Sequence, residues 1–295
     1  MGIVHIMGVG NSPGVVTTAM WYMATNQSML FSSSGSPIAD KVVFFTTPDV
    51  FLAPCPNNRP IQFAFNTPGE TRKAQKRQDL SCWNIVADFI KRDKNVGKLF
   101  AEAEFWFLQA DIVDVNKNIE TLLTFLAAET PRSFGKQGKE VWINLTGGTN
   151  VINISLLLTA YLSGAASTAY YTFCPREENH LLYPGPNFRW NFVPVMRVDW
   201  KDEFLKVLEY AHDRQPVKML EGIIDNFKQR YLVKMGALLS CDRKGLLQLT
   251  EYGRTVLHVM KLPLLRHAAE GREISAEQVR EAKNSLRSLA KELHL

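Results

Sequence analysis

Two glycine-bearing segments carry the residue types best suited to binding a phosphate group. The first, GVGNSPG at residues 8–14, follows an apolar run, and the second, TGGTN at residues 146–150, follows another. Glycine lets the chain turn with positive φ, Ser12 is a good N-cap, and Pro13 suits the first position of a helix. Such a turn points free backbone N–H groups and the positive end of a helix at one place. We therefore expect an anion site at these turns.

Other phosphate and catalytic motifs are absent from the sequence. A GxGxxG fingerprint would need glycine at Pro13, and neither GK[ST] nor GxSxG occurs. His5 lies inside an apolar run, where a histidine packed in the core is the better interpretation.

The cysteines are scattered: Cys55, Cys82, Cys174 and Cys241. Without CxxC or paired histidine spacing they argue for a reducing compartment, and we expect neither a metal nor a cofactor.

The first 200 residues alternate between strand and helix patterns. β-branched and aromatic runs predict strands at residues 4–9, 41–46, 104–108, 111–115, 140–145, 167–173 and 192–198. Helical patterns fall at residues 13–25, 79–91, 116–129 and 151–163. This alternation predicts βαβ crossovers and an α/β fold with a doubly wound, mostly parallel Rossmann-like sheet. The two glycine turns would then meet at the carboxyl ends of neighbouring strands, at the topological switch point.

The pattern changes after Trp200, which divides the chain into predicted domains of residues 1–200 and 201–295. Helical patterns at residues 204–212, 217–227 and 228–239 precede a turn, a short strand and the sequence LTEYGRTVL. This order is typical of a winged helix-turn-helix domain with residues 228–239 as the recognition helix. The candidate contacts to double-stranded DNA are Lys228, Arg230, Lys234, Arg243 and Lys244. The alternative is a dimerisation module that kept this shape without binding DNA.

The last segment of the chain shows a helix signal of its own. Ser275 and Gln278 have the spacing of a capping box. Apolar residues then recur at spacings of three and four, at Val279, Ala282, Leu286, Leu289 and Leu293. This stripe predicts one helix that packs on its own domain or pairs with a second copy of itself.

Composition and charge limit the compartment and the partners. The 295 residues are 46% hydrophobic and 21% charged, which is typical of a globular protein. No apolar run approaches the ~18 residues needed to span a bilayer, and the N-terminus lacks a basic signal-peptide region, so we expect a cytoplasmic protein without membrane contact. Residues 201–295 carry +4 of the net charge of +5. A weakly basic C-terminal part is compatible with nucleic acid.

The paired segments GVGNSPGVV and INLTGGTNVINIS together resemble the motifs of CRISPR-associated Rossmann-fold (CARF) proteins, which often carry a winged helix-turn-helix domain. The resemblance covers about residues 1–200 by motif order and residues 201–295 by module type. It implies a homodimer that binds a cyclic oligoadenylate, with cyclic tetra-adenylate the first candidate, in type III CRISPR antiviral signalling. The implied ligand-binding residues are Gly10, Asn11, Ser12, Pro13, Thr146, Gly147, Gly148, Thr149 and Asn150.

Two functions are compatible with this resemblance, and a third is less favoured. The first is a ligand-controlled DNA-binding regulator. The second is a ring nuclease that cleaves the ligand by metal-free attack of a ribose 2′-hydroxyl, arranged by Ser12, Asn11 and Asn150. Relatives that cleave usually carry Lys or Arg where this chain has Asn150, so stabilisation of the developing charge is weaker here. The third is a ribonuclease that uses Arg287 and His294 on one helix face.

Adenine rings need aromatic or amide partners as well as phosphate contacts. The candidates for those contacts are Trp21, Phe51 and Asn66.

Overall fold

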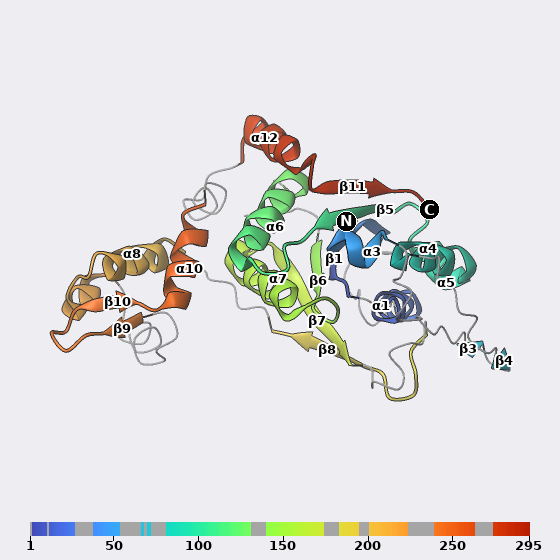
Figure 1. Cartoon of the computed structure of the whole chain (residues 1–295), viewed down its shortest axis with the longest axis horizontal. Helices are drawn as coiled ribbons and strands as arrows, with labels where there is room; N and C mark the ends of the chain where they lie inside the picture. The colour runs from blue at the N-terminus through green and yellow to red at the C-terminus, as the bar shows by residue number, and fades with distance from the viewer. Residues whose placement is uncertain are drawn as a thin grey trace.

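The computed structural model describes most of the chain (Figure 1). The described residues are 2–10, 12–26, 38–53, 66–67, 70–71, 81–130, 140–173, 183–194, 201–223, 239–262 and 274–295. Within them no helix is long and apolar enough to cross a membrane.

A seven-stranded sheet forms the centre of the molecule, in the order β11-β5-β2-β1-β6-β7-β8. The strands are β1 (Gly2–Gly8), β2 (Ile38–Thr46), β5 (Glu104–Gln109), β6 (Glu140–Asn144), β7 (Ala166–Phe173), β8 (Arg189–Val193) and β11 (Ala290–Leu293). The five inner strands are parallel, whereas β11 and β8 pair antiparallel at the two edges. The prediction of a mostly parallel α/β sheet is confirmed.

Helices cover both faces of the sheet (Figure 1). One face packs against α1 (Gly14–Thr25), α3 (Pro48–Phe51), α4 (Cys82–Arg92) and α5 (Lys94–Leu99). The other face packs against α6 (Val115–Glu129), α7 (Asn150–Ser163) and α12 (Ala276–Leu286). Two short strands, β3 (Asn66–Thr67) and β4 (Glu70–Thr71), pair with each other outside the sheet. The result is the three-layer arrangement that βαβ crossovers produce.

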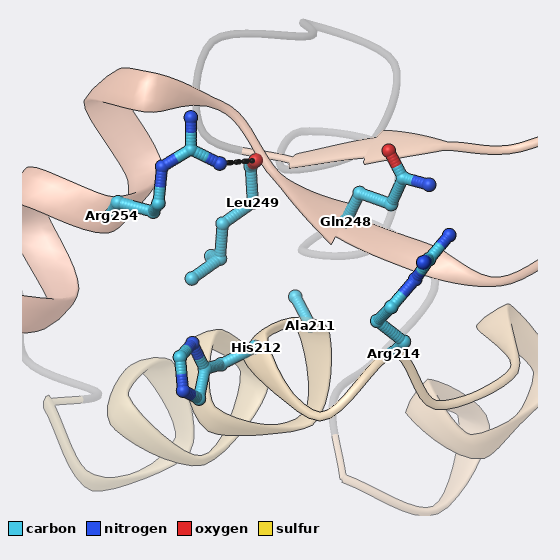
Figure 2. A pocket seen from close by; sticks show the side chains of 6 residues that line it. All are labelled: Ala211, His212, Arg214, Gln248, Leu249 and Arg254. Carbon is cyan, nitrogen blue, oxygen red and sulfur yellow. Dashed lines mark hydrogen bonds between the residues drawn. The ribbon is translucent and has the colours of Figure 1, made fainter.

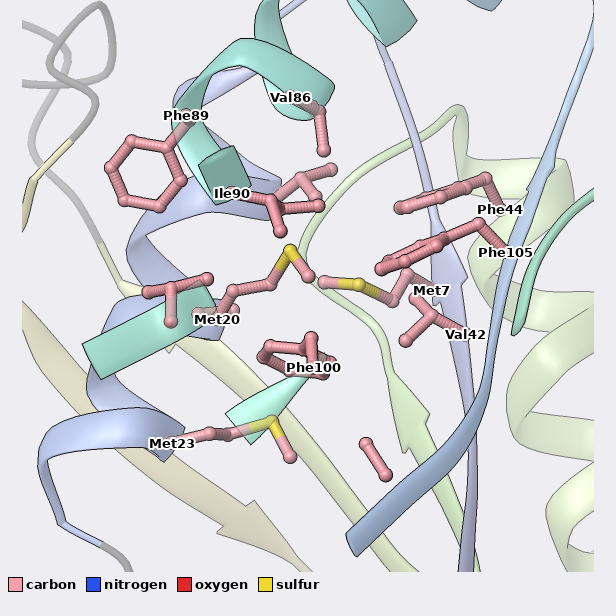
Figure 3. Close-up of a cluster of buried hydrophobic side chains, with 14 of the residues drawn as sticks. Met7, Met20, Met23, Val42, Phe44, Val86, Phe89, Ile90, Phe100 and Phe105 are labelled. Carbon is pink, nitrogen blue, oxygen red and sulfur yellow. The ribbon is translucent and has the colours of Figure 1, made fainter. Parts of the chain in front are cut away.

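The core under α1 is built from thioether and aromatic side chains (Figure 3). Met7 of β1, Met20 of α1 and Phe44 of β2 are fully buried there. Phe105 of β5 stacks parallel to Phe44, with 6.4 Å between ring centroids. Methionine adapts its shape to irregular spaces between rigid rings, which suits the gap between a helix and a twisted sheet.

One predicted strand is not a strand. Residues 111–115 form a turn because the Asp111 carboxylate accepts hydrogen bonds from the backbone N–H groups of Val113 and Asp114. The Asp114 carboxylate then accepts from the N–H of Lys117 and caps α6. Aspartate side chains compete with strand pairing in this way, and the β-branched residues between them conceal the turn in the sequence.

A smaller unit follows residue 200. It contains α8 (Lys201–His212), the 3-10 helix η1 (Val217–Gly222), the antiparallel pair β9 (Leu239–Cys241) and β10 (Leu247–Leu249), and α10 (Glu251–Met260). Its apolar core includes Ile119 of α6 and Leu158 of α7. The unit therefore packs directly on the outer helices of the sheet. The division at residue 200 stays a prediction.

The recognition helix predicted at residues 228–239 lies almost wholly outside the described residues. The predicted helix at residues 217–227 is described only to Ile223, where it is the short 3-10 helix η1. β9 and β10 form an antiparallel hairpin where the sequence predicts a turn and a short strand. The winged helix-turn-helix assignment stays a prediction.

The end of the chain returns to the sheet and corrects the predicted terminal helix. The capping box of Ser275 and Gln278 is confirmed, but α12 ends at Leu286. β11 then pairs with β5, where it covers backbone groups that an edge strand would expose. Leu293 consequently lies in the core on a strand, and Arg287 and His294 do not share a helix face.

Candidate functional site

The two glycine turns follow adjacent strands. β1 and β6 are parallel neighbours, with Ile6 paired to Ile143 and Met7 to Asn144. The sheet continues to β2 on one side of this pair and to β7 on the other, so the strand order reverses between them. Parallel α/β sheets bind ligands outside the carboxyl ends of strands at such a switch point. The predicted side-by-side placement of the turns is confirmed.

The backbones of the turns are in contact at their glycines. A Cβ added to Gly147 would lie 2.3 Å from the carbonyl oxygen of Gly8, and one added to Gly8 would lie 2.7 Å from the carbonyl oxygen of Gly147. A Cβ on Gly10 would lie 3.2 Å from the backbone nitrogen of Gly148. Glycine is therefore required at the first two positions by close approach.

The second turn leads into the N-terminus of α7 with several amide groups unused. Gly148 turns the chain with φ +88°, and the Thr149 hydroxyl accepts a hydrogen bond from the N–H of Ile152. Within the part of the chain that the structure describes, no hydrogen-bond acceptor is found for the N–H groups of Gly147, Gly148, Asn150 and Val151. Together with the helix dipole they form the type of site that accepts an anion.

The first turn leads into the N-terminus of α1 in a slightly different way than expected. Pro13 takes the N-cap position that the sequence assigned to Ser12, so the start of α1 is shifted by one residue. The carbonyl oxygen of Ser12 instead accepts from the N–H of Val15, at 3.2 Å. Asn11 lies outside the described residues. The roles predicted for these residues toward a ligand stay predictions.

Side chains from the neighbouring strands fix both turns. The Asn144 side chain accepts from the N–H of Thr146 at 2.8 Å, and the Thr46 hydroxyl donates to the carbonyl oxygen of Val9 at 2.7 Å. Asn153, in the first turn of α7, places its side-chain oxygen 2.9 Å from where a Gly8 Cβ would lie. That oxygen is buried and has no hydrogen-bond partner among the described residues. In the sequence, Asn153 stands out only as a polar residue in an otherwise apolar helix pattern, which does not indicate a role at the turns.

His5 is a core histidine, as the sequence predicted. Its Nε2 lies 2.6 Å from the hydroxyl of Tyr170, and burial lowers the pKa of the imidazole to about 3. Burial also raises the pKa of the Tyr170 hydroxyl, and the Asn144 side chain opposes that rise. Trp190 stacks on Tyr170 with 3.7 Å between ring centroids. This neutral, aromatic cluster supports the sheet beneath the second turn.

The three residues proposed for adenine contacts lie on different elements. Phe51 is fully buried in the core, so its prediction is wrong. Trp21 packs edge-on against Tyr183, and Asn66 is described only as part of β3. Three large apolar side chains that no sequence pattern indicated are exposed near the second turn: Ile154, Tyr171 and Phe173.

The predicted DNA contacts divide into two groups. Arg243 and Lys244 are exposed in the turn between β9 and β10. Lys228, Arg230 and Lys234 fall outside the described residues.

Cys82 is buried and Cys241 exposed, both as free thiols, and the described residues include no cluster that could hold a metal ion.

Comparisons with known proteins give distant similarities. No protein-family model matches the chain. An uncharacterized protein of Archaeoglobus fulgidus is 25% identical over 203 residues, which cover 59% of this chain and 57% of that protein. The chain therefore spans little more than half the length of this relative.

Three solved structures are similar to the chain at low sequence identity. Enterococcus italicus Csm6, bound to cyclic hexa-2′-fluoro-hexa-dAMP, shows 12% identity and a TM-score of 0.38 over 79% of this chain and 50% of its own. Can2 from Sulfobacillus thermosulfidooxidans, in complex with cyclic tetra-adenylate, shows 9% identity and a TM-score of 0.30 over 96% of this chain and 64% of its own. Protein VC1899 from Vibrio cholerae shows 10% identity and a TM-score of 0.31 over 96% of this chain and 67% of its own.

Proposed function

We propose that the chain is a homodimeric receptor for a cyclic oligoadenylate, with cyclic tetra-adenylate the first candidate, and that the ligand controls DNA binding by the C-terminal part. The observation that carries this proposal is the backbone contact between the turns at Gly8 and Gly147, at the switch point of the sheet. The paired motifs that resemble CARF proteins thus lie in one place rather than at opposite ends of the fold.

The ligand chemistry fits the donors that this place offers. A cyclic oligoadenylate is a ring of adenosine units joined by phosphodiester groups. Each phosphate can accept hydrogen bonds from the N–H groups of Gly148, Asn150 and Val151, which have no acceptor among the described residues. A hydrogen bond to a charged group contributes about 1.5–3 kcal/mol. Binding through backbone amides requires few cationic side chains, which agrees with a net charge of only +1 for residues 1–200.

A homodimer is supported by an apolar surface next to the second turn. Ile154 on α7 is 48% exposed, and Tyr171 and Phe173 on β7 are 44% and 52% exposed. Residues alternate between the two faces of a strand, so the two β7 side chains share the face of Ala169, which packs on the α7 side. Because α7 begins at Asn150, a second copy bound here would bring its own turn toward the first.

Two-fold symmetry then matches the ligand. An isologous interface presents each amide-lined turn twice, around one axis. A cyclic tetra-adenylate has the same two-fold relation between its halves, so four phosphates meet paired helix N-termini. Neither copy alone would surround the ring.

The decisive experiment substitutes Gly10. A methyl group there would lie 3.2 Å from the backbone nitrogen of Gly148, so the second turn must shift by a few tenths of an ångström, and the methyl group would crowd that N–H. We expect Gly10→Ala to fold normally and to lose at least tenfold in affinity for cyclic tetra-adenylate in calorimetric titration. Gly222→Ala is the control, because nothing lies within 4 Å of the added methyl group. Absence of binding of the tri-, tetra- and hexa-adenylate rings by the wild-type protein would overturn the proposal.

The same titration separates the regulator from the ring nuclease. Linear product that forms with wild-type protein and disappears in Asn150→Ala would support cleavage, since Asn150 opens α7 beside the free amides. Without product, DNA binding measured over a salt series should change on ligand addition. A duplex affinity that is unaffected by a bound ligand would exclude the regulatory role.

A further inference from the structure

An open cavity of about 250 Å³ lies in the unit after residue 200, between α8, β10 and the start of α10 (Figure 2). Its lining residues are Ala211, His212, Arg214, Gln248, Leu249 and Arg254. None of these six side chains is a carboxylate, and four of them carry nitrogen donors. Figure 2 shows Arg254 and Arg214 at opposite ends of the cavity, with Leu249 and Ala211 between them.

Each guanidinium group is held by one neighbour among the described residues. Arg254 donates from Nη1 to the carbonyl oxygen of Leu249 at 3.1 Å. Arg214 donates from Nη2 to the Asp242 carboxylate at 3.1 Å. A guanidinium has five N–H donors in a rigid fork, which suits the oxygen atoms of a phosphate group.

Asp242 fixes the positions of Arg214 and Gln248, because one oxygen of its carboxylate accepts hydrogen bonds from both side chains. Its other oxygen accepts hydrogen bonds from the backbone N–H groups of Lys244 and Leu246. The N–H of Leu246 is the main reason that the pKa of the Asp242 carboxyl group is lowered, with Lys244 and Arg214 adding to the effect. The carboxylate is thus tied to the hairpin turn, and Arg214 is oriented by a group that does not itself line the cavity.

The backbone of Arg214 is in a conformation that arginine rarely adopts. Its φ is 56°, and it is the one non-glycine residue with positive φ in the described part of the chain. The N–H groups of Arg214 and Gln215 bond to the carbonyl oxygens of Ala211 and Tyr210, which is the Schellman pattern at the end of α8. Glycine is usual at this position because it avoids the strain. A strained arginine that lines a cavity is therefore a sign of function.

We propose that this cavity is a phosphate-binding site in which Arg214 and Arg254 supply guanidinium donors from its two ends, with His212 and Gln248 as further donors. The phosphate belongs either to a small phosphorylated molecule or to the backbone of a nucleic acid. The proposal does not rest on the cyclic oligoadenylate receptor, because the cavity contains no residue of the glycine turns.

The test uses the strain at Arg214 to separate binding from folding. Arg214→Gly removes the guanidinium and relieves the backbone, so we expect an equal or higher melting temperature together with at least a tenfold loss of affinity. Arg254→Gln should lose affinity to a similar extent. Arg280→Gln removes one exposed positive charge from α12 and serves as the control.

Two probes identify the source of the phosphate group. The wild-type chain and its variants are titrated with inorganic phosphate by NMR and with a labelled DNA duplex by fluorescence anisotropy at low salt. If the cavity variants lose only the binding of inorganic phosphate, the site takes a small phosphorylated ligand. If they lose the binding of the duplex, whether or not phosphate binding is also lost, the site takes a nucleic-acid backbone. The proposal is overturned if the wild-type protein binds neither probe, or if the cavity variants bind like Arg280→Gln.

Discussion

The hydroxyl oxygen of Thr146 lies 2.7 Å from the backbone nitrogen of Thr172 and accepts its hydrogen bond. The hydroxyl group of Thr172 is a second partner, at 3.1 Å. Thr146 begins the second glycine turn, and Thr172 lies on β7, the next strand of the sheet. The side chain that the sequence assigns to ligand binding therefore also fastens the turn to the sheet.

Loss of this hydroxyl should destabilise the fold. Thr146→Val keeps the branched shape but leaves the N–H of Thr172 without its acceptor, and an unsatisfied buried donor costs about 1–3 kcal/mol. Urea unfolding measures that loss of free energy, and Thr146→Ser should restore most of it. Thr124→Val is the control, because its exposed hydroxyl only bonds within α6. Equal stability of the two valine variants would contradict this role of Thr146.

The contact between the turns predicts a second destabilised variant. The methyl group of Gly147→Ala would overlap the carbonyl oxygen of Gly8, so the two turns must separate. Overpacking of this kind costs about 1–3 kcal/mol of unfolding free energy. Gly222→Ala meets no atoms and should be neutral or slightly stabilising. Thermal and urea unfolding of both variants check the difference, and a neutral Gly147→Ala would contradict the observed proximity.

Much of the sheet could be predicted from the sequence because parallel strands are buried on both faces. Apolar runs such as β1 and β6 then stand out, and their alternation with helices fixes the class of fold. The adjacency of the glycine turns followed from the same pattern. The turn at Asp111 was missed because it depends on side-chain hydrogen bonds to particular backbone groups. The local pattern of apolar and β-branched residues does not indicate that these side-chain hydrogen bonds will form in place of strand pairing.

Buried His5 predicts a pH dependence of stability. The imidazole has a pKa of about 3 in the folded protein, lowered by burial, and about 6.5 in the unfolded chain. The unfolded chain therefore takes up a proton below pH 6.5 that the folded protein does not, so stability is lost as the pH falls from 6.5 toward 3. Linkage gives a loss of about 2 kcal/mol between pH 7 and pH 5.

His5→Gln tests this dependence, since glutamine can still bond to the hydroxyl of Tyr170. Urea unfolding at pH 7 and pH 5 should give nearly the same free energy for this variant. His258→Gln is an exposed control on α10 and should keep the wild-type slope. The backbone N–H of Val113 lowers the pKa of the Asp111 carboxyl group, so that group titrates below the window. A wild-type slope in His5→Gln would assign the effect to other groups.

The C-terminal strand predicts unequal effects for two leucines. Leu293 on β11 is 6% exposed and packs in the core, whereas Leu295 is 44% exposed. Truncation of a buried leucine costs about 2–5 kcal/mol, so Leu293→Ala should lower the unfolding free energy by that amount and Leu295→Ala hardly at all. Thermal unfolding provides the comparison. Similar melting temperatures would indicate that β11 does not pair with β5 in solution.

The missed strand shows why the end of the chain could not be predicted. The apolar spacing from Val279 to Leu293 suits one helix, and the structure uses its first part in that way. The second part, from Ala290, pairs with β5 because the sheet has an open edge there. A segment with helix propensity can form a strand instead when it pairs with the edge strand of a sheet. The pairing satisfies N–H and C=O groups that the edge strand would otherwise expose to solvent. No local sequence pattern near Leu293 indicates that this segment pairs with residues 105–108.

The apolar surface beside the second turn predicts where a dimer breaks. Ile154→Glu or Phe173→Glu places a charge in the proposed interface, and we expect the dissociation constant to rise at least tenfold, which corresponds to about 1.4 kcal/mol. Phe192→Glu is the matched control, because Phe192 is 57% exposed but pairs with Tyr170, whose side chain points to the opposite face of the sheet. Sedimentation velocity over a concentration series, with and without cyclic tetra-adenylate, measures all three. Equal dissociation constants for the interface and control variants would place the dimer contact elsewhere, and a wild-type protein that stays monomeric with ligand would remove the two-fold site.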